Sequence, residues 1–172
     1  DDRTSRGLGD VYKRQWGTRE AKIDTEYRVF FTEQEMLSNF HTWWVENTPD
    51  VVTGWNCNLY DIPYICRRIE RVLGEKWQKS LSPWNKVNMR EVFIKGRKNL
   101  SYNILGVSIL DYLDLYRKFT YTNQESYRLD HIAFVELDER KLDHSEFENF
   151  KAFYTEDWQK FVEYNIHDVE LV

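Results

Sequence analysis

Residues 51–65 read VVTGWNCNLYDIPYI, and this stretch decides the expected fold. Val51 to Trp55 is a short run of β-prone residues, which predicts a strand buried on both faces. A helix is expected from Asp61, with Pro63 near its first turn and Gly74 just past its end. A strand that leads through a loop into a helix is the repeating unit of α/β proteins. An α/β fold is therefore predicted.

The sequence around this unit continues the alternation of strands and helices. Thr32 and Glu35 form a capping box, which predicts a helix start just after a β-prone run. Trp43 and Trp44 recur at helical spacing with other apolar residues, so both are expected in the core. The further predicted elements are a strand at 27–31, a hairpin from 87–94 and 100–104, a buried strand at 106–110, and helices through 111–119, 126–137 and 155–172.

The composition is that of one globular domain. The chain has 172 residues, of which 41% are hydrophobic and 16% aromatic, with only 7 Gly and 3 Pro, and this excludes collagen-like and disordered chains. No run of about 18 apolar residues and no signal-peptide core occurs, so no membrane span is expected. Cys57 and Cys66 form no CxxC pair and are expected to be inert thiols. A soluble, cytoplasmic protein is predicted.

Both chain ends are unlike those of a complete domain. Residues 1–15, DDRTSRGLGDVYKRQ, are polar and aperiodic and begin without Met, so they are expected to be a disordered or extraneous leader. The domain is then expected to occupy residues 16–172. Its last helical pattern runs to Val172 without the Gly, Asn or Pro that commonly ends a helix, which predicts further sequence beyond it.

Two acidic residues have positions suited to chemistry. Asp61 follows a predicted strand, at the sheet edge where open α/β sheets bind ligands. Tyr164 and Asp168 lie four residues apart, on one face of the last predicted helix. A carboxylate and a phenol placed together are able to hold a metal ion and orient a water. By spacing alone, solvated acids at helix ends remain the alternative.

Three segments, in order, resemble the proofreading 3′–5′ exonuclease domain of family B DNA polymerases, most like those of large tailed phages. They are TGWNCNLYDIPYI, which resembles the second exonuclease motif, GVSILDYLDLYRKF, and YNIHDVELV, which resembles the third motif, Tyr-x-x-x-Asp. The resemblance covers about Tyr27 to Val172. It implies a ribonuclease-H-like fold, with a mixed central sheet flanked by helices and an inserted β-hairpin, here as an incomplete domain.

The resemblance also implies roles for individual residues. In this family four carboxylates bind two Mg²⁺ or Mn²⁺ ions, and by resemblance Asp61 and Asp168 are two of these ligands. The Tyr164 hydroxyl would orient the attacking water, and Lys141 falls where phage relatives carry a lysine near the scissile phosphate. Two closely spaced divalent cations require several carboxylates, because their positive charges must be neutralised.

Two residues of the second motif are expected to contact DNA. By resemblance, Tyr60 would pack against the unpaired 3′-terminal base, and Asn56 would lie near the strand end. Stacking of a base on an aromatic ring suits a site that accepts any nucleotide, because every base has a π face.

The first motif of the family, Asp-x-Glu, is where the sequence departs from the pattern. Asp24-Thr25-Glu26 has the right letters but lies only 37 positions before Asp61 (61 minus 24), too close for the strands and helix that normally intervene. We therefore interpret Asp24 and Glu26 as unrelated to metal binding and the true motif as missing. With half the ligands absent, the fragment is expected to bind metal poorly and to cut slowly or not at all.

The net charge of −5 conceals a basic middle of the chain. Residues 67–98 contain ten basic and three acidic residues, a net charge of +7, whereas from Asp130 onward twelve acidic residues accompany four basic ones, a net charge of −8. A basic segment predicts phosphate contact, with a solvated helix face as the alternative. Phage relatives carry a hairpin here that helps to separate primer from template. The expected DNA contacts in it are Arg90, Lys95, Arg97 and Lys98.

Three other polar residues are expected to have ordinary roles. Asp111 and Asp114 are predicted to cap and solvate the helix of DYLDLY rather than bind metal. His167 is adjacent to Asp168 and rotated about 100° from it on a helix, so Tyr164 is the better partner for the attacking water.

The expected function is removal of 3′-terminal nucleotides by the exonuclease part of a DNA-directed DNA polymerase. The expected partners are a single-stranded 3′ end, primer–template DNA, the remainder of the polymerase chain and a sliding clamp. A stand-alone exonuclease of the same superfamily, or an inactive nucleic-acid-binding or structural module, remains an alternative.

Overall fold

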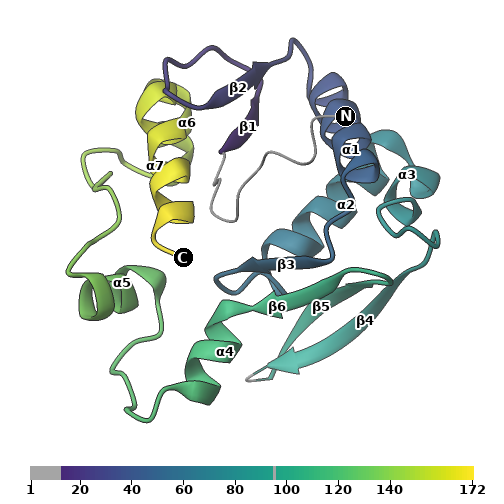
Figure 1. The fold of residues 1–172 in the computed structure, drawn as a ribbon. Coiled ribbons are helices and arrows are strands. Elements are labelled where there is room, and N and C mark those ends of the chain that lie inside the picture. Colours follow the sequence, from purple (N-terminus) through teal and green to yellow (C-terminus); the bar gives the residue numbers. More distant parts are fainter. Residues whose placement is uncertain (1–12, 95) are drawn as a thin grey trace, which may run out of the picture.

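The computed structural model describes residues 13–94 and 96–172 and has a mixed α/β architecture (Figure 1). Short strands and helices alternate along the first two thirds of the chain, and helices alone form the last third. In order, the elements are β1 (Arg14–Gly17), β2 (Glu26–Val29), α1 (Glu33–Glu46), β3 (Val51–Gly54), α2 (Asp61–Leu73), α3 (Glu75–Lys79), β4 (Val87–Ile94), β5 (Arg97–Ile104), β6 (Ser108–Asp111), α4 (Tyr112–Phe119), α5 (Leu129–Leu137), α6 (Phe150–Glu156) and α7 (Trp158–Glu170).

Within the described residues the strands form three separate pairs rather than one central sheet. β1 pairs with β2 and β3 with β6, both in parallel, whereas β4 and β5 form the predicted antiparallel hairpin. The predictions that the strand at 51–55 is buried on both faces and that the strand at 106–110 is buried are wrong. Val51 is 52% exposed and Leu110 is 44% exposed, because each strand has a single described neighbour and faces alternate between protein and solvent.

Helix α1 begins as the sequence predicts. The Thr32 hydroxyl accepts a hydrogen bond from the Glu35 N–H, and the Glu35 carboxylate accepts one from the Thr32 N–H, at 3.2 Å each. Trp44 is buried, as expected, and its indole N–H donates to the Leu81 carbonyl oxygen at 2.8 Å. Trp43 is half-buried and packs against the edge of the same core.

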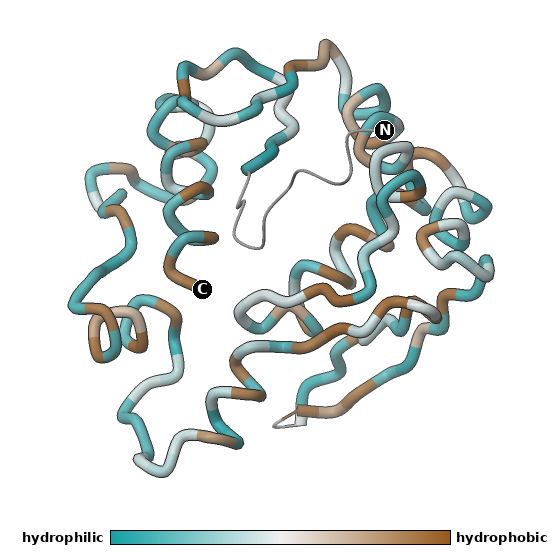
Figure 2. The backbone as a smooth tube through the Cα atoms, in the orientation of Figure 1, coloured by the Kyte–Doolittle hydropathy of each residue, from teal (hydrophilic) through white to brown (hydrophobic). Residues whose placement is uncertain are grey.

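The main core lies where α1, α2 and the hairpin meet (Figure 2). It is formed by apolar residues that are nearly or fully buried: Leu37, Trp44, Ile62, Cys66, Ile69, Leu81, Tyr102, Ile104 and Val107. Burial raises the pKa of the Cys66 thiol to about 12 and that of the Cys57 thiol to about 11, where Asp111 and Asp61 add to the effect. Both thiols are free and stay protonated at neutral pH, as expected of inert cysteines.

Several helices and strands begin or end at residues other than those predicted from the sequence. β2 ends at Val29, so Phe31, expected within that strand, is 99% exposed. The helix expected at 126–137 begins at Leu129. The single helix expected at 155–172 is two helices, α6 and α7, separated at Asp157, whose carboxylate accepts from the Lys160 N–H at 2.9 Å. An aspartate that caps the following helix stabilises a break that helical periodicity does not predict.

The chain end also differs from the expectation. Arg14 and Gln15, counted with the leader by the sequence, form part of β1, while residues 1–12 lie outside the described residues. Among the helices that are described, none has both the length and the apolar character needed to span a bilayer.

Candidate active site

The loop between β3 and α2 carries the first group of site residues. A buried aspartate at the end of β6 accepts hydrogen bonds from this loop. Asp111, at the end of β6, is 5% exposed. Its Oδ1 accepts hydrogen bonds from the N–H groups of Asn56 at 2.9 Å and Leu113 at 3.1 Å, and its Oδ2 accepts from the Asn58 N–H at 3.0 Å. The predicted cap of α4 is confirmed through Leu113, but the two bonds to the loop are additional.

Asn56 contributes through its backbone. Its φ of 62° is in the left-handed region, which Asn adopts more readily than most residues. Its carbonyl oxygen accepts from the N–H groups of Leu59 and Tyr60 at 3.2 Å each, and the Cys57 carbonyl accepts from the Ile62 N–H at 3.0 Å. The loop therefore continues directly into the first turn of α2. The expected contact of Asn56 with a strand end stays a prediction.

Asp61 and Tyr60 lie together at the start of α2 and face open space. Tyr60 is 70% exposed, as a ring that is to stack on a base must be. The pKa of the Asp61 carboxyl is raised, chiefly because the surrounding protein displaces water, with a smaller effect from the negative charge of Asp111. The N–H of Asp61 itself acts in the opposite direction by hydrogen bonding to the carboxylate.

A cavity of about 1200 Å³ adjoins Asp61. Its walls come from α2, α1, β1 and α7, with Tyr60, Asp61 and Tyr64 on one side and Ile166 and Val169 of α7 among the others. In Figure 1, α7 lies on the left of the view and α2 lies to the right of the centre. The lining is mostly apolar and aromatic, as in many ligand sites.

The second group of site residues is on α7 and the segment before α6. The Lys141 ammonium donates to Asp168 Oδ2 at 2.6 Å and to the Tyr164 hydroxyl oxygen at 3.1 Å. The structure thus brings together three of the four predicted catalytic residues. The Oδ1 atom of Asp168 is buried and has no hydrogen-bond partner among the residues that the structure describes. Burial alone would lower the pKa of Lys141, but its bonds to Asp168 and Tyr164 outweigh this and raise it.

Sequence reasoning missed the contacts that hold Lys141 in place. Asp130 on α5 accepts from the Lys141 N–H at 3.0 Å and from the Arg140 guanidinium at 3.1 Å. His167 Nε2 lies 2.8 Å from the Arg140 carbonyl oxygen. These contacts span 10 to 27 positions of sequence, and no local pattern signals them. His167 thus contacts the Lys141 segment, a position compatible with the non-catalytic role expected for it.

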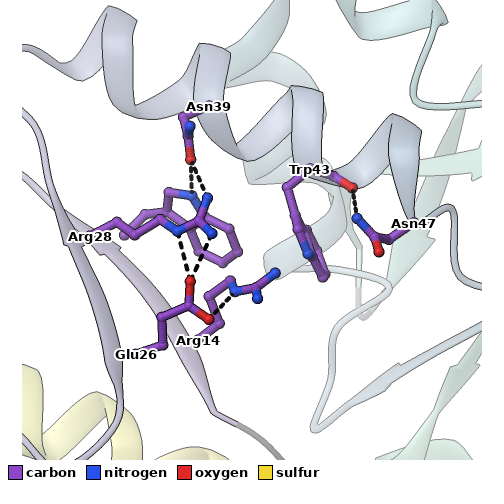
Figure 3. A network of polar contacts seen from close by, with 7 residues as sticks. Arg14, Glu26, Arg28, Asn39, Trp43 and Asn47 are labelled. Carbon is purple, nitrogen blue, oxygen red and sulfur yellow. Dashed lines mark hydrogen bonds and ion pairs between the residues drawn. The ribbon is translucent and has the colours of Figure 1, made fainter. Parts of the chain in front are cut away.

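Asp61 and Asp168 are not gathered into one metal site by the described residues. Within residues 13–94 and 96–172, no three His, Cys, Asp or Glu side chains lie close enough to hold a cation. Glu26 is engaged elsewhere, in ion pairs with Arg14 at 2.6 Å and Arg28 at 2.7 Å (Figure 3). The hydrogen bond from Arg14 is the main cause that lowers the pKa of the Glu26 carboxyl; burial opposes it, and the hydrogen bond from Arg28 and the charges of both arginines add to the lowering.

The hairpin presents its basic residues to solvent. Arg90, Arg97 and Lys98 are exposed, and Lys98 forms an ion pair with Glu91 across the strands at 2.5 Å. Lys95, the fourth predicted contact, lies outside the described residues. Exposed cations on a projecting hairpin are free to approach a phosphate backbone.

Comparison with known proteins adds sequence relationships to this geometry. Residues 10–132 match the family described as "DNA polymerase family B, exonuclease domain". The chain is 37% identical over 143 residues to the DNA-directed DNA polymerase of Escherichia phage RB69 and 39% identical over 147 residues to that of Enterobacteria phage T4. These alignments cover 83% and 85% of this chain but 16% of either relative.

A relative of lower sequence identity is also named a DNA polymerase. The chain is 26% identical over 155 residues to the DNA polymerase of Bombyx mori nuclear polyhedrosis virus, which covers 86% of this chain and 15% of that relative. The chain therefore spans about a sixth of the length of the curated relatives described here.

Proposed function

This chain belongs to the exonuclease domain family of family B DNA polymerases, and on that premise we propose that it is the proofreading part of a DNA-directed DNA polymerase. In the complete domain it removes 3′-terminal nucleotides by two-metal hydrolysis. The observation that carries the proposal is the cluster of Lys141, Tyr164 and Asp168, in which a carboxylate, a phenol and an ammonium group converge.

The oxygen donors of Asp61 and Asp168 fit divalent cations in their chemistry, although the described residues do not gather three such side chains around one position. Asp168 Oδ1 is buried without a hydrogen-bond partner in residues 13–94 and 96–172, and a carboxylate oxygen in that state favours a cation. Asp61 offers a second carboxylate at the start of α2. Oxygen ligands of this kind suit Mg²⁺ or Mn²⁺. When bound, such ions neutralise charge on a scissile phosphate and activate a water.

The chain's own residues supply positioning around this centre. The Tyr164 hydroxyl oxygen accepts a hydrogen bond from Lys141, so its own proton remains available to orient a water. The Lys141 charge lies beside the same hydroxyl and favours an anionic phosphate nearby. Tyr60, exposed on the cavity wall, is positioned to stack on the terminal base without selecting its identity.

We extend the proposal to the fold and the DNA-binding surface. The parallel pair of β3 and β6 supports a ribonuclease-H-like sheet, to which an upstream strand with an Asp-x-Glu motif would add the two remaining carboxylates. The exposed basic residues of α2 and the hairpin support contact with primer–template DNA. The rest of a polymerase chain, a sliding clamp and a place in the host cytoplasm are parts of the same proposal.

The decisive experiment compares this chain with a longer one that includes its natural upstream sequence. The longer chain is expected to digest single-stranded 3′ ends in the presence of Mg²⁺, and Asp61→Asn or Asp168→Asn should each remove most of that activity. Asp114→Asn, an exposed acid on α4, is the matched control. Full activity of the 172-residue chain would contradict the missing first motif, and an inert longer chain would favour an inactive binding module.

DNA contact by the hairpin has its own test. Replacing Arg97 and Lys98 together by Ala should weaken binding to a duplex end and flatten its salt dependence, since each lost phosphate contact reduces the slope by about one. The control replaces Lys151 and Lys160 of the acidic C-terminal part by Ala. An unchanged slope in the hairpin variant would argue against phosphate contact.

A further inference from the structure

Asp111 accepts more hydrogen bonds than a helix cap requires. A cap at the start of α4 needs one side-chain oxygen to accept one N–H, a task that Ser, Thr or Asn performs equally well. Here Oδ1 accepts from Leu113 and Asn56, and Oδ2 accepts from Asn58. A carboxylate buried to 5% exposure is costly unless such bonds satisfy it, and charge-assisted bonds to amides are among the strongest.

The two amides held by Asp111 belong to the loop that sets the start of α2. The same Asn56 whose N–H is fixed by Asp111 accepts from Leu59 and Tyr60 through its carbonyl oxygen. In the sequence, Asn58 lies between Asn56, whose carbonyl oxygen is the acceptor, and Leu59, which is one of the two donors. A shift of the loop away from Asp111 therefore moves the first turn of α2, which carries Tyr60 and Asp61.

We infer that Asp111 is a positioning residue of the exonuclease site, which acts through the Asn56 and Asn58 amides to fix the Tyr60 ring and the Asp61 carboxylate. This inference rests on the proposed function of the domain. Asp111 makes these contacts from β6, across the parallel pairing that sets Gly54 opposite it, so the sheet and the loop are locked to each other. No role as a metal ligand is needed for Asp111, because its two oxygens are engaged by N–H groups.

The test uses Asp111→Asn in the chain that includes its natural upstream sequence. An Asn side chain of the same shape keeps one oxygen for the α4 cap and for Asn56, but it turns an NH₂ group toward the Asn58 N–H, where two donors meet. The Mg²⁺ concentration for half-maximal digestion of single-stranded 3′ ends should rise about 10- to 100-fold, the range found when residues that orient metal ligands are replaced. Asp114→Asn, on the same helix and exposed, should leave it unchanged.

The readouts separate positioning from folding and from failure of the proposed function. If Asp111 matters only for stability, Asp111→Asn lowers the melting temperature but keeps the wild-type Mg²⁺ midpoint, and the inference is overturned. If the unmodified longer chain shows no Mg²⁺-dependent digestion, the proposed function fails instead. Should Asp111→Asn not fold, hydrogen exchange of the unmodified chain decides. Slow exchange of the Asn56 and Asn58 amides supports the inference, whereas exchange as fast as in exposed loops refutes it.

Discussion

The two predicted metal ligands belong to regions held together in different ways. Asp61 is attached to the region of α1, α2 and the hairpin, where aliphatic side chains such as Ile69 and Ile104 are completely buried. Asp168 is on α7, which packs against α6 and the segment before it mainly through aromatic rings around Phe153. The first region is positioned by a continuous core, and the second by a ring cluster and a few polar contacts.

This difference indicates that the two halves of the site respond differently to damage. A continuous apolar core opens as a unit, whereas a small cluster attached to polar contacts opens locally at lower free energy. The geometry around Asp61 should therefore survive perturbation of the C-terminal helices, and the reverse should hold as well. The following predictions, from the largest expected effect to the smallest, test that separation.

The largest effects are expected from truncating the centre of each region. Ile69→Ala and Phe153→Ala remove completely buried side chains and should cost about 2–5 kcal/mol and about 3–5 kcal/mol of local stability. Residue-resolved hydrogen exchange should show faster exchange in α2 and β5 for the first variant and in α6 and α7 for the second. Val169→Ala, at a 71% exposed position, is the control. Equal acceleration in both regions by either variant would remove the separation.

An intermediate effect is expected from breaking the polar contacts of the second region. Lys141→Met leaves Asp168 and Tyr164 without their shared donor and should cost about 1–3 kcal/mol. Because the folded pKa of Lys141 is raised, its stabilising contribution is complete below the unfolded value of about 10.4 and is lost as pH rises through the folded value.

Because the contribution of Lys141 is lost as pH rises, melting temperatures measured over a range of pH test it. Melting temperatures of the unmodified chain and Lys141→Met should differ by a constant amount from pH 7 to pH 10 and converge at higher pH. Lys151→Met, an exposed lysine on α6, should match the unmodified chain throughout. A difference that persists unchanged at the highest pH would mean that the Lys141 ammonium is not the stabilising group.

The smallest effect is expected at the surface of the first region. The Arg68 guanidinium holds the Glu33 carboxylate by two hydrogen bonds and lowers its pKa, with burial opposing. Glu33→Gln should cost about 0.2–1 kcal/mol, since exposed pairs contribute little. The contribution is present above the unfolded pKa of about 4.3 and is lost as pH falls through the lowered folded value.

Urea titration at several pH values measures this effect. The difference between the unmodified chain and Glu33→Gln should be visible at pH 6 and shrink as the pH falls below about 4.3, and Glu46→Gln, at the other end of α1, should show none. A cost above about 2 kcal/mol would mean that the surface of the first region contributes as much as its core.

Features governed by neighbours in sequence were predictable. The capping box of Thr32 and Glu35, the hairpin from Val87 onward and the Asp111 cap of α4 each depend on groups a few positions apart, so their residue types alone predict them. The break at Asp157 was missed although its signal is local, because Asp within an amphipathic pattern reads as a solvated helical residue.

The sequence by itself determined the family, through motifs around Asp61 and Asp168, and the alternation of strands and helices that suits an α/β fold. Only the tertiary structure decided which faces of β3 and β6 are covered, that Asp111 holds the amides of Asn56 and Asn58, and that Lys141 reaches Asp168. Those contacts join residues 27 to 55 positions apart. Burial and long-range hydrogen bonds depend on which segments fold against one another, and no periodicity within a segment encodes that choice.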